Sequence, residues 1–571
     1  SIHPDPNRVG SAGDALESHK YRFNWNAPIA LSPQNPGTVY FGGNFLFRST
    51  NYGQSWDVIS PDLSTNDKTK QKSSGGDIVT DNTAAEFHST LLTIAPSPKD
   101  ANVIWAGTDD GNVQVTRDGG KTWTNTARNL PGLPPNAWIS TIDASPHDAA
   151  TAFVAASHWQ TGDYTPYAYM TTDYGQTWRR ITGNLPGRGW VHVVRQDPRN
   201  ANLLYLGTEF GIFASWDRGG RWHSLRNGLS AAPVRDLLVH ARDNDLIIAT
   251  HGRGIYILDD VTPLQRLGEA MAADAYVFDI RPATRWVMWS RDGSPGQKIW
   301  VGENPPNGAV IQYYLKAASQ QPVVATIADP AGKVVRTLRD GSRDAGVNQL
   351  VWDLAYDPAI TETGAGPAAG RGGGRGGRGG GPPSVVPGQF TVKVQLAGRE
   401  FTKPLTVELD PRGNVTTADL EAQRDLALSL RDLGGRVTSV IDRTEDLMGQ
   451  LTSLVDNIKK NAPNERDALN EAEGALVELR KLRDEKLLRP IQGLGYRQYP
   501  RLREEVGSLS GAVGRTITKP TDAQGRRYGE LVTETGTVQQ ELQGIVTGRI
   551  ARLNTLLKNL PHIIVRGGAI M

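Results

Sequence analysis

The sequence predicts a multidomain, mainly β protein, in which β-propeller blades precede an immunoglobulin-like β-sandwich and an antiparallel helical bundle. Three observations support this order. An eight-residue string with a Gly and a Trp at fixed positions recurs four times within the first 222 residues. Alternating apolar and polar residues follow in the middle of the chain, and leucines at helical spacing occupy its last part. With 571 residues, the chain is long enough for several cores.

The repeated string reads Ser/Thr-x-Asp/Asn-x-Gly-x-x-Trp, as in "TRDGGKTW" at 116–123. We expect the Asp or Asn to accept backbone N–H bonds within a tight turn, the Gly to supply a positive φ, and the Trp to pack between neighbouring sheets. This string is the Asp-box of propeller blades, and Trp-to-Trp separations of 67, 55 and 44 residues fit four-stranded blades with loop insertions. We therefore predict about five blades over 1–270, the fifth without a box. The structural box residues are Asn51, Trp56, Asp118, Trp123, Asp173, Trp178, Asp217 and Trp222.

The rest of the chain predicts two further domains. Strings such as "PVVATIADPAGKVVRTLRD" alternate as strands do, which favours a sandwich over 275–412. The Gly- and Arg-rich stretch 364–383 inside it is expected to be a flexible loop; the alternative is an RNA-binding tract that uses Arg371, Arg375 and Arg378. Over 416–571, apolar residues step by four and three, which predicts a helical bundle, with a coiled-coil arm for a partner as the alternative.

Composition excludes several classes of function. The net charge of +2, from 62 basic and 60 acidic residues, gives no general attraction to nucleic acid. The chain has no Cys, which excludes disulfides and thiolate chemistry, and it has no apolar run long enough to span a membrane. It also lacks HExxH, GxSxG and P-loop motifs. We expect no cofactor and no metal site, and leave open a calcium ion at Asp259–Asp260 or in the Asp109–Asp110 turn.

Function is expected on the propeller face opposite the boxes. In an up-and-down blade the box lies between strands three and four, so the turns between strands two and three emerge at the other end. Those turns carry acids, His, Arg and aromatic residues, and the third blade has the insertion "SHWQTGDYTPY" there. Ordinary hairpin turns are the alternative interpretation. The predicted ligand-binding residues are Asn44, Asp109, Asp110, His158, Trp159, Asp163, Glu209, His251 and Arg253, and the catalytic candidates among them are Asp110, Asp163 and Glu209.

The chain resembles the large secreted bacterial Asp-box (BNR-repeat) proteins with sortilin-like propellers, which are commonly labelled "glycosyl hydrolase". The resemblance rests on strings such as "FGGNFLFRSTNYGQSWDVISPDLSTND", "IWAGTDDGNVQVTRDGGKTWTN", "ATHGRGIYILDDVTPL" and "PGQFTVKVQLAGREFTKPLTVELDPR". It implies a bacterial protein that is secreted, periplasmic or on the cell surface. It further implies an upstream propeller half, so that this chain matches the C-terminal half and Ser1 follows a processing site or begins a partial chain.

Two functions remain open. A glycosidase needs two carboxylates about 5–10 Å apart, one with a raised pKa, and Asp109, Asp110, Asp163 or Glu209 could supply them beside Trp105 or Trp159 as a sugar platform. A sialidase would need three convergent arginines, whereas only Arg253 is placed on the face. Because no catalytic constellation is recognisable, the first hypothesis is a binding or scaffold protein that recognises protein or glycan through this face. Glycoside hydrolase is the alternative.

Overall fold

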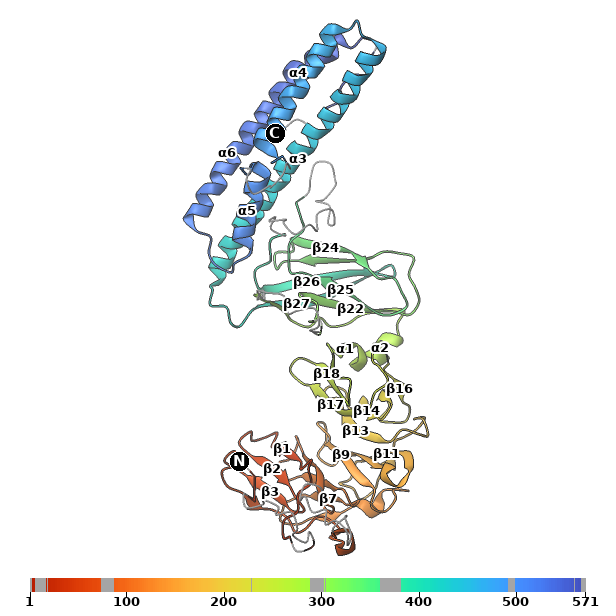
Figure 1. The fold of residues 1–571 in the computed structure, drawn as a ribbon. Helices are drawn as coiled ribbons and strands as arrows, with labels where there is room; N and C mark the ends of the chain where they lie inside the picture. The colour runs from red at the N-terminus through yellow and green to blue at the C-terminus, as the bar shows by residue number, and fades with distance from the viewer. Residues whose placement is uncertain are drawn as a thin grey trace, which may run out of the picture. The chain divides into compact units, whose positions relative to one another are not determined.

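We describe the protein from a computed structural model. The structure describes residues 3–5, 17, 19–72, 87–226, 228–287, 302, 304–359, 382–490, 499–558 and 560–565. The chain divides into two compact units, Ser1–Ala272 and Ala273–Met571 (Figure 1). Strands predominate in the first unit and in the first part of the second unit, and helices follow them. This order confirms the coarse fold prediction. The finer division into domains 1–270, 275–412 and 416–571 stays a proposal.

The first unit is a row of five antiparallel sheets, and in each sheet the strands are neighbours in chain order. Four sheets have four strands and the fifth has three. Contacts between the first strands of successive sheets place the sheets side by side, as blades of a propeller are. The strands are β1 (Ile29–Leu31), β2 (Val39–Gly42), β3 (Leu46–Ser49) and β4 (Asp57–Val58); β5 (Leu91–Pro96), β6 (Ile104–Thr108), β7 (Val113–Thr116) and β8 (Thr124–Asn125); β9 (Trp138–Ala144), β10 (Ala152–His158), β11 (Asp163–Thr171) and β12 (Arg179–Arg180); β13 (Val191–Gln196), β14 (Leu204–Thr208), β15 (Gly211–Ser215) and β16 (His223–Ser224); and β17 (Val234–His240), β18 (Asp245–Thr250) and β19 (Ile255–Leu258). Short helical turns are η2 (Lys68–Lys70), η3 (Ala127–Asn129), η4 (Trp159–Thr161), α1 (Thr262–Gln265) and α2 (Leu267–Met271).

The four repeated strings form one and the same turn, between the third and fourth strands of a sheet. In the second repeat, the Thr116 hydroxyl donates to Asp118 Oδ1 (2.8 Å) and accepts from the Gly120 N–H (3.0 Å). Asp118 Oδ1 also accepts from the Thr122 N–H at 2.9 Å. The same three bonds recur in the other repeats. The pattern of hydroxyl, acid and glycine thus closes each turn locally.

The repeat turns of the second and fourth sheets also fasten their sheet to the preceding one. Gly120 has φ +102°, and a Cβ at this position would lie 2.5 Å from the carbonyl oxygen of Ile59 in the sheet before. The Trp123 indole N–H donates to that same carbonyl at 3.0 Å. In the fourth repeat, the Trp222 indole donates to the Ile181 carbonyl at 2.6 Å. The repeat therefore joins blades as well as closing them.

Apolar side chains fill the space between consecutive sheets. Trp105 on β6 is fully buried among residues of the third sheet, including Ile139 and Tyr169. Gly107 on the same strand leaves no room for a side chain, because an added Cβ would clash with Ile139 Cγ2. Close packing of this kind fixes the spacing of neighbouring blades.

The two ends of the row of sheets expose apolar faces. In the fifth sheet, Leu238 pairs with Ile247 and Ile247 pairs with Ile257 across the strands. Leu238, Ile255 and Ile257 are 54%, 70% and 57% exposed. The matching face of the fourth sheet, with Tyr205 opposite Ala214, is fully buried against the fifth sheet. We call Leu238, Ile247, Ile255 and Ile257 the fifth-sheet end face; Ile29, Leu31 and Val58 form its exposed counterpart on the first sheet.

The second unit begins with two sheets that enclose one apolar core. Three strands form the sheet β20-β22-β25, and five form β21-β27-β26-β23-β24, in which β21 is parallel to β27. Trp352 is fully buried against Phe390. The strands are β20 (Ala275–Val277), β21 (Ala283–Arg285), β22 (Ala309–Leu315), β23 (Val323–Ala328), β24 (Val334–Gly341), β25 (Gly346–Trp352), β26 (Gly388–Leu396) and β27 (Arg399–Leu409). Most of the predicted Gly- and Arg-rich loop, up to 381, lies outside the described residues.

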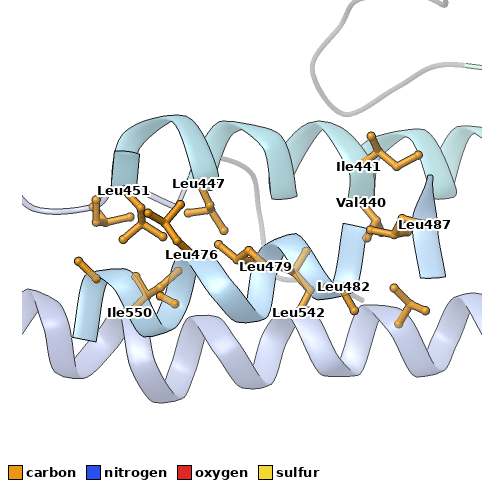
Figure 2. Packing of buried hydrophobic residues seen from close by; sticks show 14 of the residues in the cluster. Val440, Ile441, Leu447, Leu451, Leu476, Leu479, Leu482, Leu487, Leu542 and Ile550 are labelled. Carbon is orange, nitrogen blue, oxygen red and sulfur yellow. The ribbon is translucent and has the colours of Figure 1, made fainter. Parts of the chain in front are cut away.

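Helices complete the second unit. The Thr416 hydroxyl caps α3 by accepting from the Asp419 N–H, and Thr521 with Gln524 forms a capping box at α6. The helices share one leucine-rich core, part of which Figure 2 shows, where Leu447 and Leu451 of α3 lie against Leu476 of α4. The helices are α3 (Thr417–Asn461), α4 (Arg466–Leu482), α5 (Leu502–Gly514), α6 (Asp522–Ile545) and α7 (Ala551–Leu556), with π-turns η5 (Arg483–Leu487) and η7 (Val546–Ile550). Within the described ranges, no helix is both long and apolar enough to cross a membrane.

Candidate functional site

The hairpins β2–β3, β6–β7, β10–β11, β14–β15 and β18–β19 hold the predicted site residues. Each repeat turn joins the third strand of a sheet to the fourth, so these hairpins lie at the opposite ends of the strands. The connections that lead into β13 and β17 reach the same end. We call this end of the row of sheets the hairpin face.

The hairpins of the first two sheets turn their polar groups inward. The Asn44 amide is buried; it accepts from the Arg22 N–H (2.8 Å) and donates to Asp62 Oδ2 (2.8 Å). Asp110 is buried and accepts three hydrogen bonds, from the Thr65 N–H and hydroxyl and from the Thr108 hydroxyl. Asn44 and Asp110 thus have their hydrogen-bonding capacity met by the protein itself.

Asp109 is the most strongly perturbed acid of this face. It is buried and accepts from the Thr90 N–H (2.8 Å) and the Thr90 hydroxyl (3.1 Å). Burial raises the pKa of Asp109 to about 7, and the neighbouring Asp110 charge adds to the rise. His88 Nδ1 lies 3.7 Å from Asp109 Oδ2, but burial lowers the pKa of His88. The contact between them is therefore not an ion pair at neutral pH.

The β10–β11 hairpin carries the insertion singled out in the sequence. Asp163 accepts from the Thr165 N–H (3.0 Å) and from the Tyr167 hydroxyl (2.7 Å). Burial raises the pKa of Asp163, but these hydrogen bonds outweigh it and hold that pKa below its ordinary value. His158 ends β10, and Trp159 in η4 stands exposed beside it. Asp163 therefore stiffens the hairpin that presents Trp159.

Four aromatic side chains from three segments meet on the hairpin face. Trp190, in the connection before β13, stacks on Trp159 with ring centroids 5.9 Å apart and 23° between the planes. Tyr164 lies 5.5 Å and Phe210 6.4 Å from the Trp190 ring. Trp159, Tyr164 and Phe210 are 41%, 37% and 51% exposed. We call Trp159, Tyr164, Trp190 and Phe210 the aromatic cluster.

Backbone hydrogen bonds hold these segments together. The Gly189 N–H donates to the Tyr164 carbonyl (3.0 Å), and the Glu209 N–H donates to the Trp190 carbonyl (3.2 Å). Gly189 has φ +139°, and a Cβ there would lie 3.2 Å from the Phe210 ring. Backbone hydrogen bonds therefore fix the segments that carry the aromatic cluster, as is typical of preformed sites.

A polar chain borders the aromatic cluster. His192 is buried with its ring 6.1 Å from that of Trp190, and its Nε2 lies 2.8 Å from Glu209 Oε2. Arg235 Nη1 lies 3.4 Å from His192 Nδ1. Burial lowers the pKa of His192 although Glu209 acts in the opposite direction, which favours a neutral ring at pH 7. The neutral ring then donates from Nε2 to Glu209 and accepts from Arg235 at Nδ1.

The structure thus gathers some of the predicted residues and separates others. Trp159 and Glu209 lie together around Trp190, whereas Asp110 and Asp163 have other partners, and no hydrogen bond of the described residues joins any two of these three acids. His251 and Arg253 are exposed in the β18–β19 hairpin, and the charge of His251 acts on His192. Sequence reasoning missed Trp190, His192 and Arg235; the string "GRGW" before a strand was the available signal.

No group of three or more His, Asp or Glu residues that could hold a metal ion occurs in the described part of the chain. Asp260 accepts from the Thr262 N–H and hydroxyl and from Asn244. Asp109 and Asp110 accept the bonds given above. The calcium alternative stays a hypothesis.

Comparisons with known proteins add short local similarities. No family model matches the chain. The chain is 30% identical over 100 residues to the xyloglucanase Xgh74A of Acetivibrio thermocellus, which covers 16% of this chain and 12% of that enzyme. It is 28% identical over 152 residues to a xyloglucanase of Hypocrea jecorina, covering 24% of this chain and 17% of that enzyme. The matched part is thus under a fifth of either relative. Among solved structures, the GH74 xyloglucanase of Xanthomonas campestris matches at 14% identity with a TM-score of 0.31, over 66% of this chain and 63% of that one, a likeness too low to carry an argument.

Proposed function

We propose that this propeller-type protein binds glycan outside the bacterial cytoplasm through the aromatic cluster. The proposal rests on one observation: Trp159 stacks on Trp190 and remains exposed, and Tyr164 and Phe210 lie beside Trp190. Exposed, pre-ordered rings of this kind offer apolar faces to the C–H faces of sugars, while Glu209 and Arg235 supply polar groups for hydroxyls. The short similarity to xyloglucanases supports a glycan over a protein ligand.

Loss of the cluster should weaken glycan binding by about 10- to 100-fold, the cost of removing a central aromatic contact. We expect this for Trp190→Ala and for Trp159→Ala, of which Trp159→Ala removes an exposed side chain and so spares the fold. The measurement is isothermal titration of neutral and acidic oligosaccharides. Tyr52→Asn, in a repeat turn at the other end of the sheets, is the control and should leave binding unchanged; Asn tolerates its positive φ of 58°. Equal affinity of wild type and both Trp variants would refute the proposal.

Glycoside hydrolysis is the second candidate, favoured by the xyloglucanase similarity and by the raised pKa of Asp109. The same oligosaccharides, with xyloglucan added, are assayed for new reducing ends. Asp109→Asn tests the acid with the raised pKa, and Glu209→Gln, Asp110→Asn and Asp163→Asn test the three candidate acids, with circular dichroism to verify folding. If one of these variants folds normally but loses the turnover seen in wild type, catalysis replaces binding as the function.

We also propose that further blades, as the resemblance implies for an upstream half, cover the two end faces. The support is the register: Ile247 and Ile257 repeat the positions of Tyr205 and Ala214, which the next sheet buries. The chain alone should therefore self-associate through its exposed apolar faces. Ile257→Lys should raise the dissociation constant of self-association, measured by sedimentation, at least about threefold. Val347→Lys, at an exposed strand residue of the second unit, should leave it unchanged. A chain that is monomeric at high concentration would argue against uncovered blade faces.

A further inference from the structure

Two arginines near the aromatic cluster have N–H groups exposed to solvent. The Arg188 guanidinium lies 5.1 Å from the centre of the Tyr164 ring. Arg188 is exposed, and within the described part of the chain no carboxylate lies within 4.0 Å of its nitrogens. This cation–π contact places the exposed guanidinium beside the cluster, where its N–H groups can reach a ligand.

Arg235 belongs to the polar chain that borders the cluster. Its Nη1 donates to His192, while its Nη2 lies 4.0 Å from Glu209 Oε2, the outer limit of an ion pair. The stronger partner of Glu209 is His192, at 2.8 Å. Arg235 is nearly half exposed, so its remaining N–H groups face solvent. Arg188 and Arg235 thus each lie against a ring that neighbours Trp190, Tyr164 and His192 respectively.

The acids Asp163 and Glu209 keep their charge but do not pair closely with either arginine. The carboxylate of Asp163 accepts hydrogen bonds from Thr165 and Tyr167 within its own hairpin. Glu209 is held by His192. The neighbouring hairpin adds the exposed His251 and Arg253. Arg188 and Arg235 therefore keep N–H groups that a carboxylate on a ligand can reach.

We propose that the aromatic cluster takes an acidic glycan, with a uronate carboxylate bound by Arg188 or Arg235 while the sugar ring stacks on Trp159. The proposal rests on the glycan-binding function above and narrows its ligand class. A guanidinium group can donate two parallel, charge-assisted hydrogen bonds to one carboxylate. The hydroxyls of a neutral sugar form weaker hydrogen bonds with it.

The test compares one galacturonate oligosaccharide with the same compound after its carboxyl groups are reduced to alcohols. Titration calorimetry with the full chain should show about tenfold tighter binding of the acid form, a difference that shrinks at high salt. Arg188→Gln should reduce this preference at least about threefold and leave affinity for the reduced form unchanged. Arg235→Gln also removes a donor to sugar hydroxyls, so it should weaken binding of both forms and reduce the preference at least about threefold. Arg117→Gln is the matched control, since Arg117 stacks on Tyr174 at 4.0 Å in a repeat turn.

The outcomes separate the two proposals. Equal affinity for both probes, with Trp159→Ala weakening both, overturns the acidic ligand and leaves glycan binding standing. A preference that survives in both arginine variants overturns the assignment to Arg188 and Arg235. Binding of neither probe, nor of any other glycan tested, removes the function and this inference with it.

Discussion

Trp105→Ala should lower the free energy of unfolding of the first unit by about 3–5 kcal/mol, the range for truncating a fully buried Trp. Trp105 has no exposed surface, and its ring meets that of Trp178 edge-on at 5.8 Å. The side chain fills the space between the second and third sheets, and the tight contact of Gly107 with Ile139 limits how far these sheets can close over a cavity. Hydrogen exchange of peptides from β6 and β10, measured along a urea titration, reads this interface separately from the second unit.

Two further substitutions sharpen this experiment. Trp105→Phe keeps a ring and removes an indole N–H that has no hydrogen-bond partner among the described residues. It should therefore lower the free energy of unfolding by about 1.5 kcal/mol or less. Trp25→Ala truncates a Trp that is 75% exposed and should stay within about 0.5 kcal/mol of wild type. If Trp105→Ala behaves like Trp25→Ala, the second and third sheets do not pack as described.

The repeat turns were readable from sequence because their interactions are local. Asp118 accepts from Thr116 and Thr122, all inside one eight-residue string, and Gly120 takes the positive φ expected of it. The helical end was equally readable, since the spacing from Leu447 to Leu451 is set by one helix. Local rules thus determined the kinds of element and their order.

The candidate site was less readable because its contacts join distant segments. Asp110 accepts from Thr65, 45 residues earlier, which no local pattern announces. Trp190 and Trp159 come from a connection and a hairpin of different sheets, and only the packing of those sheets brings their rings together. The sequence could therefore indicate which face carries chemistry, but not which turn residues are free to bind.

The free energy of unfolding should fall as pH rises from about 4 to about 7, through the titration of Asp109. Its pKa is about 7 in the folded protein and 3.8 in the ordinary, solvated state, so the folded form holds the proton more tightly. The stabilisation is fully present below pH 3.8 and is lost as pH rises through the folded pKa. The gap corresponds to at most about 4 kcal/mol.

Asp109→Asn should remove this dependence, because an amide oxygen still accepts from the Thr90 N–H and its NH2 can donate to the Thr90 hydroxyl. The variant should match wild type near pH 4 and exceed it at pH 8 in local stability, measured by hydrogen exchange of the β6–β7 peptide. Asp173→Asn provides a control of opposite sign: burial raises the pKa of Asp173, but hydrogen bonds from Thr177 outweigh it and hold that pKa below its ordinary value. That variant should be less stable than wild type at pH 7, with the deficit vanishing as pH falls below about 4. If Asp109→Asn is the weaker protein at pH 8, the carboxylate is stabilised by its surroundings and Asp109 is not a buried acid of raised pKa.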